Sequence, residues 1–113
     1  MMHLIRALKD LSDIEISKCL ATSLGWEVLG ESSDGICVDK KAIGSFNISN
    51  WSDIMPLAVD NNVFFEMISM HGLTKYKAVQ LLSDGSHDYS MYGSTPQMAI
   101  ALCLIHTQED KHD

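Results

Sequence analysis

The feature that most constrains this fold is an uninterrupted apolar run near the C-terminus, residues 98–105. Thr95 and Pro96 precede the run, and they are typical of a helix cap followed by proline at the first helical position. The sequence therefore predicts a helix over 97–108, with a frayed tail over 109–113. Because this helix is apolar on nearly every side, it must be well buried. If one core could not cover it, the uncovered side would form a homodimer interface.

A second helix is predicted over residues 13–24 from the signals at its two ends. Ser12 can cap the first turn, and Glu15, three residues on, can reach back to the Ser12 amide as a capping box. Gly25 supplies a residue that tolerates the left-handed conformation at the C-terminal stop.

Five short runs rich in β-favouring residues are bounded by turn formers or loops, and they predict strands. The runs are residues 26–29, 36–38, 63–70, 76–82 and 87–92. The first two predict a hairpin, and the last three predict a three-stranded meander. Between these groups, a loop over 44–49 leads into a short helix, whose Trp51 we expect to lie in the core.

The resulting order, α-β-β-α-β-β-β-α, predicts one α+β domain over residues 1–113. We expect about five strands in one mostly antiparallel sheet, with the helices packed on one of its faces. A chain of this length and 46% hydrophobic content can bury such a core without disulfide or metal staples.

The chain is strongly acidic, with eight Lys and Arg against fifteen Asp and Glu and a formal net charge of −7. The cations are scattered and only Arg6 is an arginine, which argues against direct binding of nucleic acid. An acidic protein favours basic partners instead. Four carboxylates crowd the first hairpin, at Glu27, Glu31, Asp34 and Asp39. We interpret them as a solvated hairpin tip and not as a catalytic pair.

The sequence carries no catalytic or metal-binding signature. Its three cysteines lack the spacing of a staple or zinc knuckle, so we expect reduced thiols, with Cys37 in the core. The five histidines include no pair at the helical offset that lets two imidazoles share a metal. Ser86, His87 and Asp88 are adjacent and indicate a turn, because a catalytic triad needs side chains that converge from separate elements. We therefore expect no enzymatic activity, no cofactor and no metal.

A membrane span is not expected either, because the longest apolar run is far shorter than the ~20 residues that cross a bilayer. Neither a leader segment nor a stop-transfer pattern is recognisable. We expect a cytosolic protein.

Three segments together resemble one family. Residues 11–18, which read Leu-Ser-Asp-Ile-Glu-Ile-Ser-Lys and lead to the Leu-Gly pair at 24–25, are similar to the opening of the NinX-like proteins. These are small accessory proteins of tailed bacteriophages. Residues 51–57, ahead of the Asn-Asn pair at 61–62, and residues 95–99 also resemble this family. The resemblance implies a phage origin and the host cytosol, and it implies no catalytic residue.

The segment over 83–95 is the candidate partner-binding site, because tyrosines are large, stiff, amphipathic and common anchors in interfaces. The residues singled out are Asp84, His87, Asp88, Tyr89 and Tyr92. Strand alternation offers a purely structural interpretation, in which Tyr89 and Met91 are buried while Ser90 and Tyr92 face water.

These features favour a small, non-catalytic phage accessory protein that binds a basic surface of a host protein and inhibits it. The expected target is a nucleic-acid-handling or antiviral defence protein. The alternative is a protein that sequesters a cyclic-nucleotide signal in a pocket lined by Tyr76, Tyr89 and Tyr92. The scarcity of arginine, the usual phosphate-gripping side chain, counts against that alternative.

Overall fold

The computed structural model describes residues 12–81 and 87–112, and all structural statements below concern these residues. The helices are α2 (Asp13–Ser23), α3 (Trp51–Asp60) and α4 (Pro96–His112). The strands are β1 (Glu27–Ser32), β2 (Gly35–Asp39), β3 (Ile43–Phe46), β4 (Val63–Met70), β5 (Leu73–Leu81) and β6 (His87–Gly93). The predicted α+β class is confirmed. No helix in the described ranges is long and apolar enough to cross a membrane.

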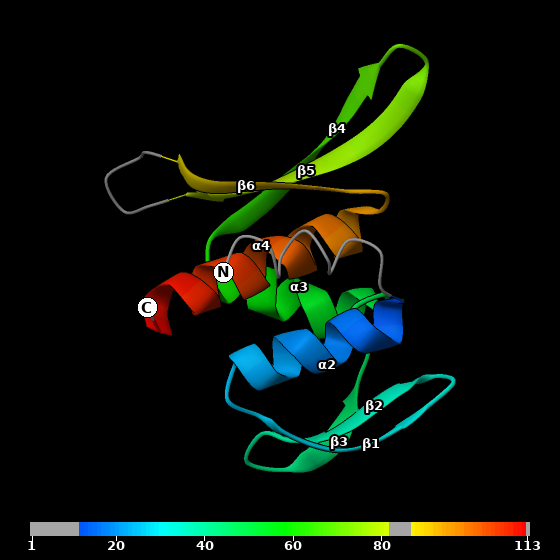
Figure 1. Cartoon of the computed structure of the whole chain (residues 1–113), viewed down its shortest axis with the longest axis vertical. Coiled ribbons are helices and arrows are strands. Elements are labelled where there is room, and N and C mark those ends of the chain that lie inside the picture. The colour runs from blue at the N-terminus through cyan, green and yellow to red at the C-terminus, as the bar shows by residue number, and fades with distance from the viewer. Residues whose placement is uncertain (1–11, 82–86, 113) are drawn as a thin grey trace.

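The strands form two separate antiparallel sheets with the helices between them (Figure 1). Sheet A has the order β1-β2-β3, and sheet B has the order β4-β5-β6. The expectation of one sheet of about five strands, covered by helices on one face, is therefore wrong. Each sheet packs one face on the shared helical layer, so the described chain has three layers.

The strand missing from the predicted order is β3, whose residues fall largely in the expected loop over 44–49. Gly44 and Ser45 have weak strand propensity, so nothing local predicts it. The strand is held by antiparallel pairing with β2, from Ile36 opposite Phe46 to Asp39 opposite Ile43. Pairing that depends on a partner strand cannot be inferred from a short run alone.

The apolar helix α4 is covered on all sides within the chain. Every residue from Met98 to Ile105 is buried, because sheet B packs on one side and α2 and α3 pack on others. Gly93 ends β6 so close to α4 that an added Cβ would lie 2.7 Å from the Ala99 nitrogen. The uncovered apolar side of α4 that would form a homodimer interface is thus not found over residues 98–105. The helix continues to His112, through most of the segment expected to fray.

The N-terminal caps of α2 and α4 and the glycine stop of α2 are in place, whereas the Glu15 carboxylate lies near Lys18 and makes no hydrogen bond to the Ser12 amide in the described residues. The Ser12 hydroxyl accepts a hydrogen bond from the Glu15 amide at 3.2 Å, and Gly25 has a φ of 82° after the helix ends. At α4, the Thr95 hydroxyl accepts from the Met98 amide at 3.1 Å. These caps fix where both helices begin, as local sequence predicted.

Sheet A is tied to α2 through a buried hydroxyl. Ser17 donates to the Asp13 carbonyl at 2.7 Å and accepts from the Ile48 amide at 3.0 Å, just after β3. Asn47, also buried, donates to the Asp34 carbonyl and accepts from Ser49. These side chains satisfy backbone groups that would otherwise be buried without partners.

Candidate binding surface

Sheet B turns one face toward α4 and the other away from the helical layer. Ala78 and Met91 lie opposite each other in the register and are buried against α4. Their neighbours Lys77 and Tyr92 also lie opposite each other, and they point the other way because strand side chains alternate. We name that side the outer face of sheet B. Its described side chains are Phe64, Glu66, Ile68, Leu73, Lys75, Lys77, Val79, Leu81 and Tyr92.

No described element covers the outer face of sheet B (Figure 1). This face carries large exposed apolar side chains. Phe64 is 58% exposed, Leu73 is 64% exposed and Tyr92 is 45% exposed. Two shallow recesses lie between these side chains. One, of about 240 Å³, is lined by Phe64, Phe65, Glu66, Lys77, Val79 and Leu81. The other, of about 150 Å³, is lined by Ile68, His71, Leu73, Lys75 and Tyr92.

Exposed apolar groups continue onto the opposite side of β4, beyond the part of sheet B that α4 covers. Phe65 is 41% exposed and Met67 is 67% exposed. The ring of Trp51, at the start of α3, lies 5.5 Å from the ring of Phe65. Trp51 is itself 40% exposed, so its expected place in the core is wrong. It stands on the surface beside β4.

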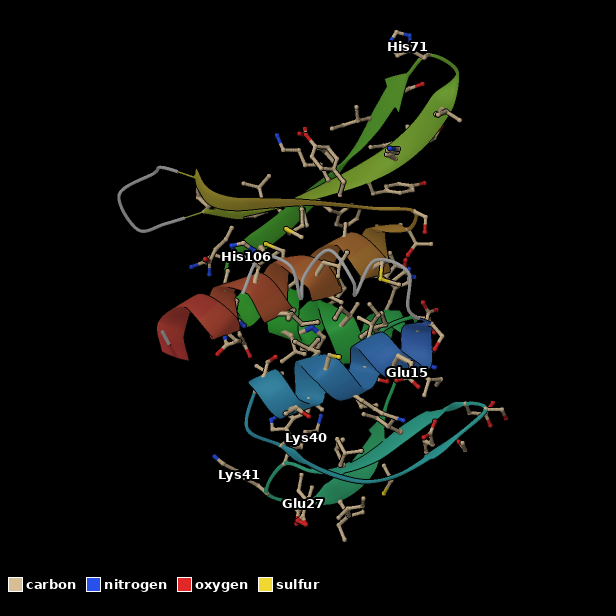
Figure 2. All side chains as sticks on the ribbon, viewed as in Figure 1. Glu15, Glu27, Lys40, Lys41, His71 and His106 are labelled. Atoms are coloured by element: carbon tan, nitrogen blue, oxygen red, sulfur yellow. The ribbon has the colours of Figure 1, made fainter. Side chains whose placement is uncertain are left out.

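The charges are distributed unevenly between the two ends of the molecule. Residues 12–62 carry eight carboxylates and three lysines, whereas residues 63–81 carry Glu66 and two lysines. Figure 2 shows Glu27, Lys40 and Lys41 at the sheet A end and His71 at the tip of the β4–β5 hairpin. Residues 12–62 are therefore more acidic than residues 63–81, and most of the exposed large apolar side chains in the described ranges lie on sheet B.

On sheet A the acidic residues are solvated, as predicted. Glu27 and Asp39 are exposed and lie directly opposite each other in the β1–β2 register. Glu31 pairs with Lys18 of α2, with 2.5 Å between the Lys18 Nζ and the carboxylate. This hydrogen bond raises the pKa of the Lys18 ammonium above its ordinary value. Cys37, expected in the core, is only half-buried, because it alternates with the buried Ile36 and Val38.

The five residues predicted for partner binding are placed only in part. Asp84 lies outside the described residues, and the side chains of His87, Asp88 and Tyr89 on β6 also lie outside them. Tyr92 is exposed and Met91 is buried, which is the pattern that strand alternation predicted. Tyr92 thus joins a surface built mainly by β4 and β5.

Sequence reasoning missed the contribution of β4. Residues 63–68 place apolar side chains at both odd and even positions around Glu66, so no alternation of polar and apolar residues indicates a solvent-exposed face. Such a run is typical of a strand buried on both faces. Glu66 is the signal that could have indicated an exposed side of this strand, since an unpaired charge inside a fully buried strand is costly.

The pocket expected for a cyclic nucleotide is not assembled by its two described tyrosines. Tyr76 lies opposite Gly93 and packs on the α4 side, whereas Tyr92 is on the outer face of sheet B. A recess of about 490 Å³ at the end of β6 is lined by Tyr92, Lys75 and Asp13 among others, and Tyr76 is not among its described lining residues. Tyr76 and Tyr92 therefore cannot sandwich one ligand.

Comparison with known proteins does not assign this surface. No protein-family model matches the chain, and no curated protein matches its sequence significantly. Among the described residues, no three His, Cys, Asp or Glu side chains are grouped so that they could hold a metal ion. The resemblance to NinX-like proteins stays a prediction, and the function has to be argued from the surface itself.

Proposed function

We propose that this chain is a non-catalytic binding protein that docks a basic partner protein on the outer face of sheet B. The observation that carries the proposal is the uncovered apolar surface around Phe64, Leu73 and Tyr92. Glu66, Lys75 and Lys77 lie between Phe64 and Leu73 on this face. Clusters of exposed apolar side chains rimmed by polar residues mark interaction sites on soluble domains. Tyr92 is the aromatic anchor expected near the centre of such a contact.

The acidic residues of the sheet A half indicate that the partner carries positive charge. Residues 12–62 carry a formal charge of −5, which attracts a basic protein and speeds its approach. The contact itself combines apolar side chains with Glu66, Lys75 and Lys77, and its apolar groups determine how long the complex lasts. Together with the resemblance to phage accessory proteins, this favours a host nucleic-acid-handling or antiviral defence protein, whose activity the bound chain would block.

The test begins with capture of host proteins on the tagged chain, followed by kinetics with the captured partner. We expect Phe64→Ser combined with Tyr92→Ser to raise the dissociation rate at least tenfold, because apolar contacts are lost. Added salt should lower the association rate and leave the dissociation rate nearly unchanged.

The matched control is Ile43→Ser on sheet A, since Ile43 is 70% exposed and equally apolar. This variant should bind like the unmodified chain. If Ile43→Ser releases the partner and the sheet B double variant does not, docking on sheet B is refuted. A partner that dissociates faster at high salt would show that charge, and not the apolar face, holds the complex.

A further inference from the structure

The open edge of β4 differs from the other described sheet edges. β4 is eight residues long, pairs with β5 in unbroken register from Val63 to Met70, and contains no proline or lysine. Natural sheets protect such edges with short strands, bulges, lysine or proline, because an exposed edge pairs readily with another strand. β4 has none of these protections.

Sheet A shows what protection looks like in the same molecule. Its edge strand β1 has a register shift between Val28 and Gly30, and its other edge strand β3 is only four residues long with Gly44 and Ser45 at its centre. Neither edge has a long row of regularly spaced backbone groups. The other edge of sheet B, β6, pairs with β5 through a register shift between Val79 and Leu81, so β4 is the described edge best suited to strand pairing.

The backbone and side chains of β4 are both accessible to an incoming strand. In the described ranges, no backbone hydrogen bond joins β4 to any element except β5. Phe64 is exposed on one side of the strand, and the Trp51–Phe65 pair is exposed on the other. An added strand would therefore find backbone partners along its length and an aromatic contact on each face.

Glu66 indicates the chemistry of that strand. It is the only charged residue in β4, it lies on the outer face, and it forms no ion pair within the described residues although Lys77 is opposite it. A second copy is a poor occupant, because pairing centred on Glu66 would set two carboxylates against each other and join two chains of charge −7.

We infer that the β4 edge accepts an extended segment of the partner protein by strand addition, with a lysine or arginine of that segment beside Glu66. The inference rests on the proposed binding function and names the chemistry of the bound segment. Backbone hydrogen bonds give affinity, apolar side chains on one face of the added strand pack on Trp51 and Phe65, and Glu66 selects the basic residue. The partner's folded surface would occupy the neighbouring outer face of sheet B.

The probe is a pair of nine-residue peptides of alternating threonine and valine, with either lysine or glutamate at the central threonine position. The full chain should bind the lysine peptide about fivefold more tightly than the glutamate peptide, since cross-strand charge pairs differ by this order. Binding should slow amide hydrogen exchange over residues 63–70 and leave sheet A unchanged.

Glu66→Lys supplies the decisive variant. It should reverse the preference, so that the glutamate peptide binds more tightly than the lysine peptide. Glu27→Lys on sheet A makes the same change in net charge and should retain the original preference. If Glu27→Lys also reversed the peptide preference, the net charge of the chain, and not Glu66, would select the peptide.

Two further outcomes overturn the inference. One is equal affinity of both peptides for the unmodified chain and for Glu66→Lys. The other is slowed exchange over 63–70 that grows with protein concentration in the absence of peptide, which would show a second copy on the edge. If neither peptide binds while the Phe64→Ser and Tyr92→Ser double variant still releases the captured partner, strand addition is refuted. The proposed function is then retained.

Discussion

The two sheets have the same number of strands and the same antiparallel topology but meet solvent in different ways. Each consists of three antiparallel strands with one face on the helical layer. Sheet A presents carboxylates, a bulge and a short edge strand to water. Sheet B presents Phe64, Leu73 and Tyr92 on its outer face and a regular eight-residue edge. Sheet A exposes two large apolar side chains, Leu29 and Ile43, whereas sheet B exposes five in the described ranges and retains more surface that a partner can cover.

The sheets also differ in how they attach to the helices. Sheet B is attached by apolar burial and by the close approach of Gly93 to α4. Sheet A uses the Ser17 hydroxyl of α2 and the Asp53 carboxylate of α3, which accepts from the Asn47 backbone amide, in addition to apolar contacts of Ile36, Val38 and Phe46. These attachments can be weakened separately.

The largest effect is expected from Leu104→Ala, in the helix on which sheet B packs. Leu104 is fully buried, so the substitution should lower the free energy of unfolding by about 2–5 kcal/mol. Because α2 packs on α4 and also on sheet A, both sheets should lose hydrogen-exchange protection together. Denaturant unfolding followed by hydrogen exchange measures this. Sheet A that stays protected after sheet B opens would show two independent units.

Ser17→Ala should have the next largest effect and should act mainly on sheet A. It leaves the buried Ile48 amide without its acceptor, at an expected loss of about 1–3 kcal/mol in the free energy of unfolding. Ser23→Ala is the matched control, because Ser23 also donates to the carbonyl four residues earlier but accepts no bond from another element in the described ranges. Equal losses in the two variants, measured by urea unfolding, would contradict the role given to Ser17.

A smaller and opposite effect is expected at Glu27→Gln. Glu27 and Asp39 oppose each other across β1 and β2, so removing one charge should raise the free energy of unfolding by about 0.2–1 kcal/mol. The gain should shrink as salt screens the repulsion. Thermal unfolding at two salt concentrations tests this, with Glu66→Gln on sheet B as the comparison. A gain that does not depend on salt would indicate another cause.

The smallest effect concerns the Lys18–Glu31 pair that joins α2 to β1. Since the pKa of Lys18 is raised in the folded protein, its contribution to stability is present at neutral pH and is lost as the pH rises through that raised pKa. Both side chains are partly solvated, so the change should be slight. The Lys18→Met variant should lack this pH dependence. The measurement is the free energy of unfolding of both proteins across the alkaline pH range. An identical alkaline profile in both proteins would contradict it.

Much of the fold follows from local sequence. The Ser12 and Thr95 caps, the turn at Gly25 and the burial of residues 98–105 were predictable, because each depends on short-range chemistry. The strand β3 and the division into two sheets were not. Which strands pair depends on contacts between distant segments, and α3 separates β3 from β4 in the chain.

The candidate surface was less predictable than the fold. Tyr92 could be placed by alternation, but the exposure of Phe64, Phe65 and Met67 could not, because the same apolar run fits a buried strand. Trp51 was misplaced for the same reason, since composition does not say which side of a helix remains uncovered. Exposure of apolar residues is a property of the assembled layers.

The most direct test of the account is amide hydrogen exchange of the chain alone and saturated with its captured partner. Exchange over β4, the tip of the β4–β5 hairpin and the end of β6 near Tyr92 should slow in the complex, while residues 27–46 of sheet A remain unchanged. Protection confined to sheet A, with sheet B exchanging as in the free chain, would contradict the assignment of sheet B as the docking surface.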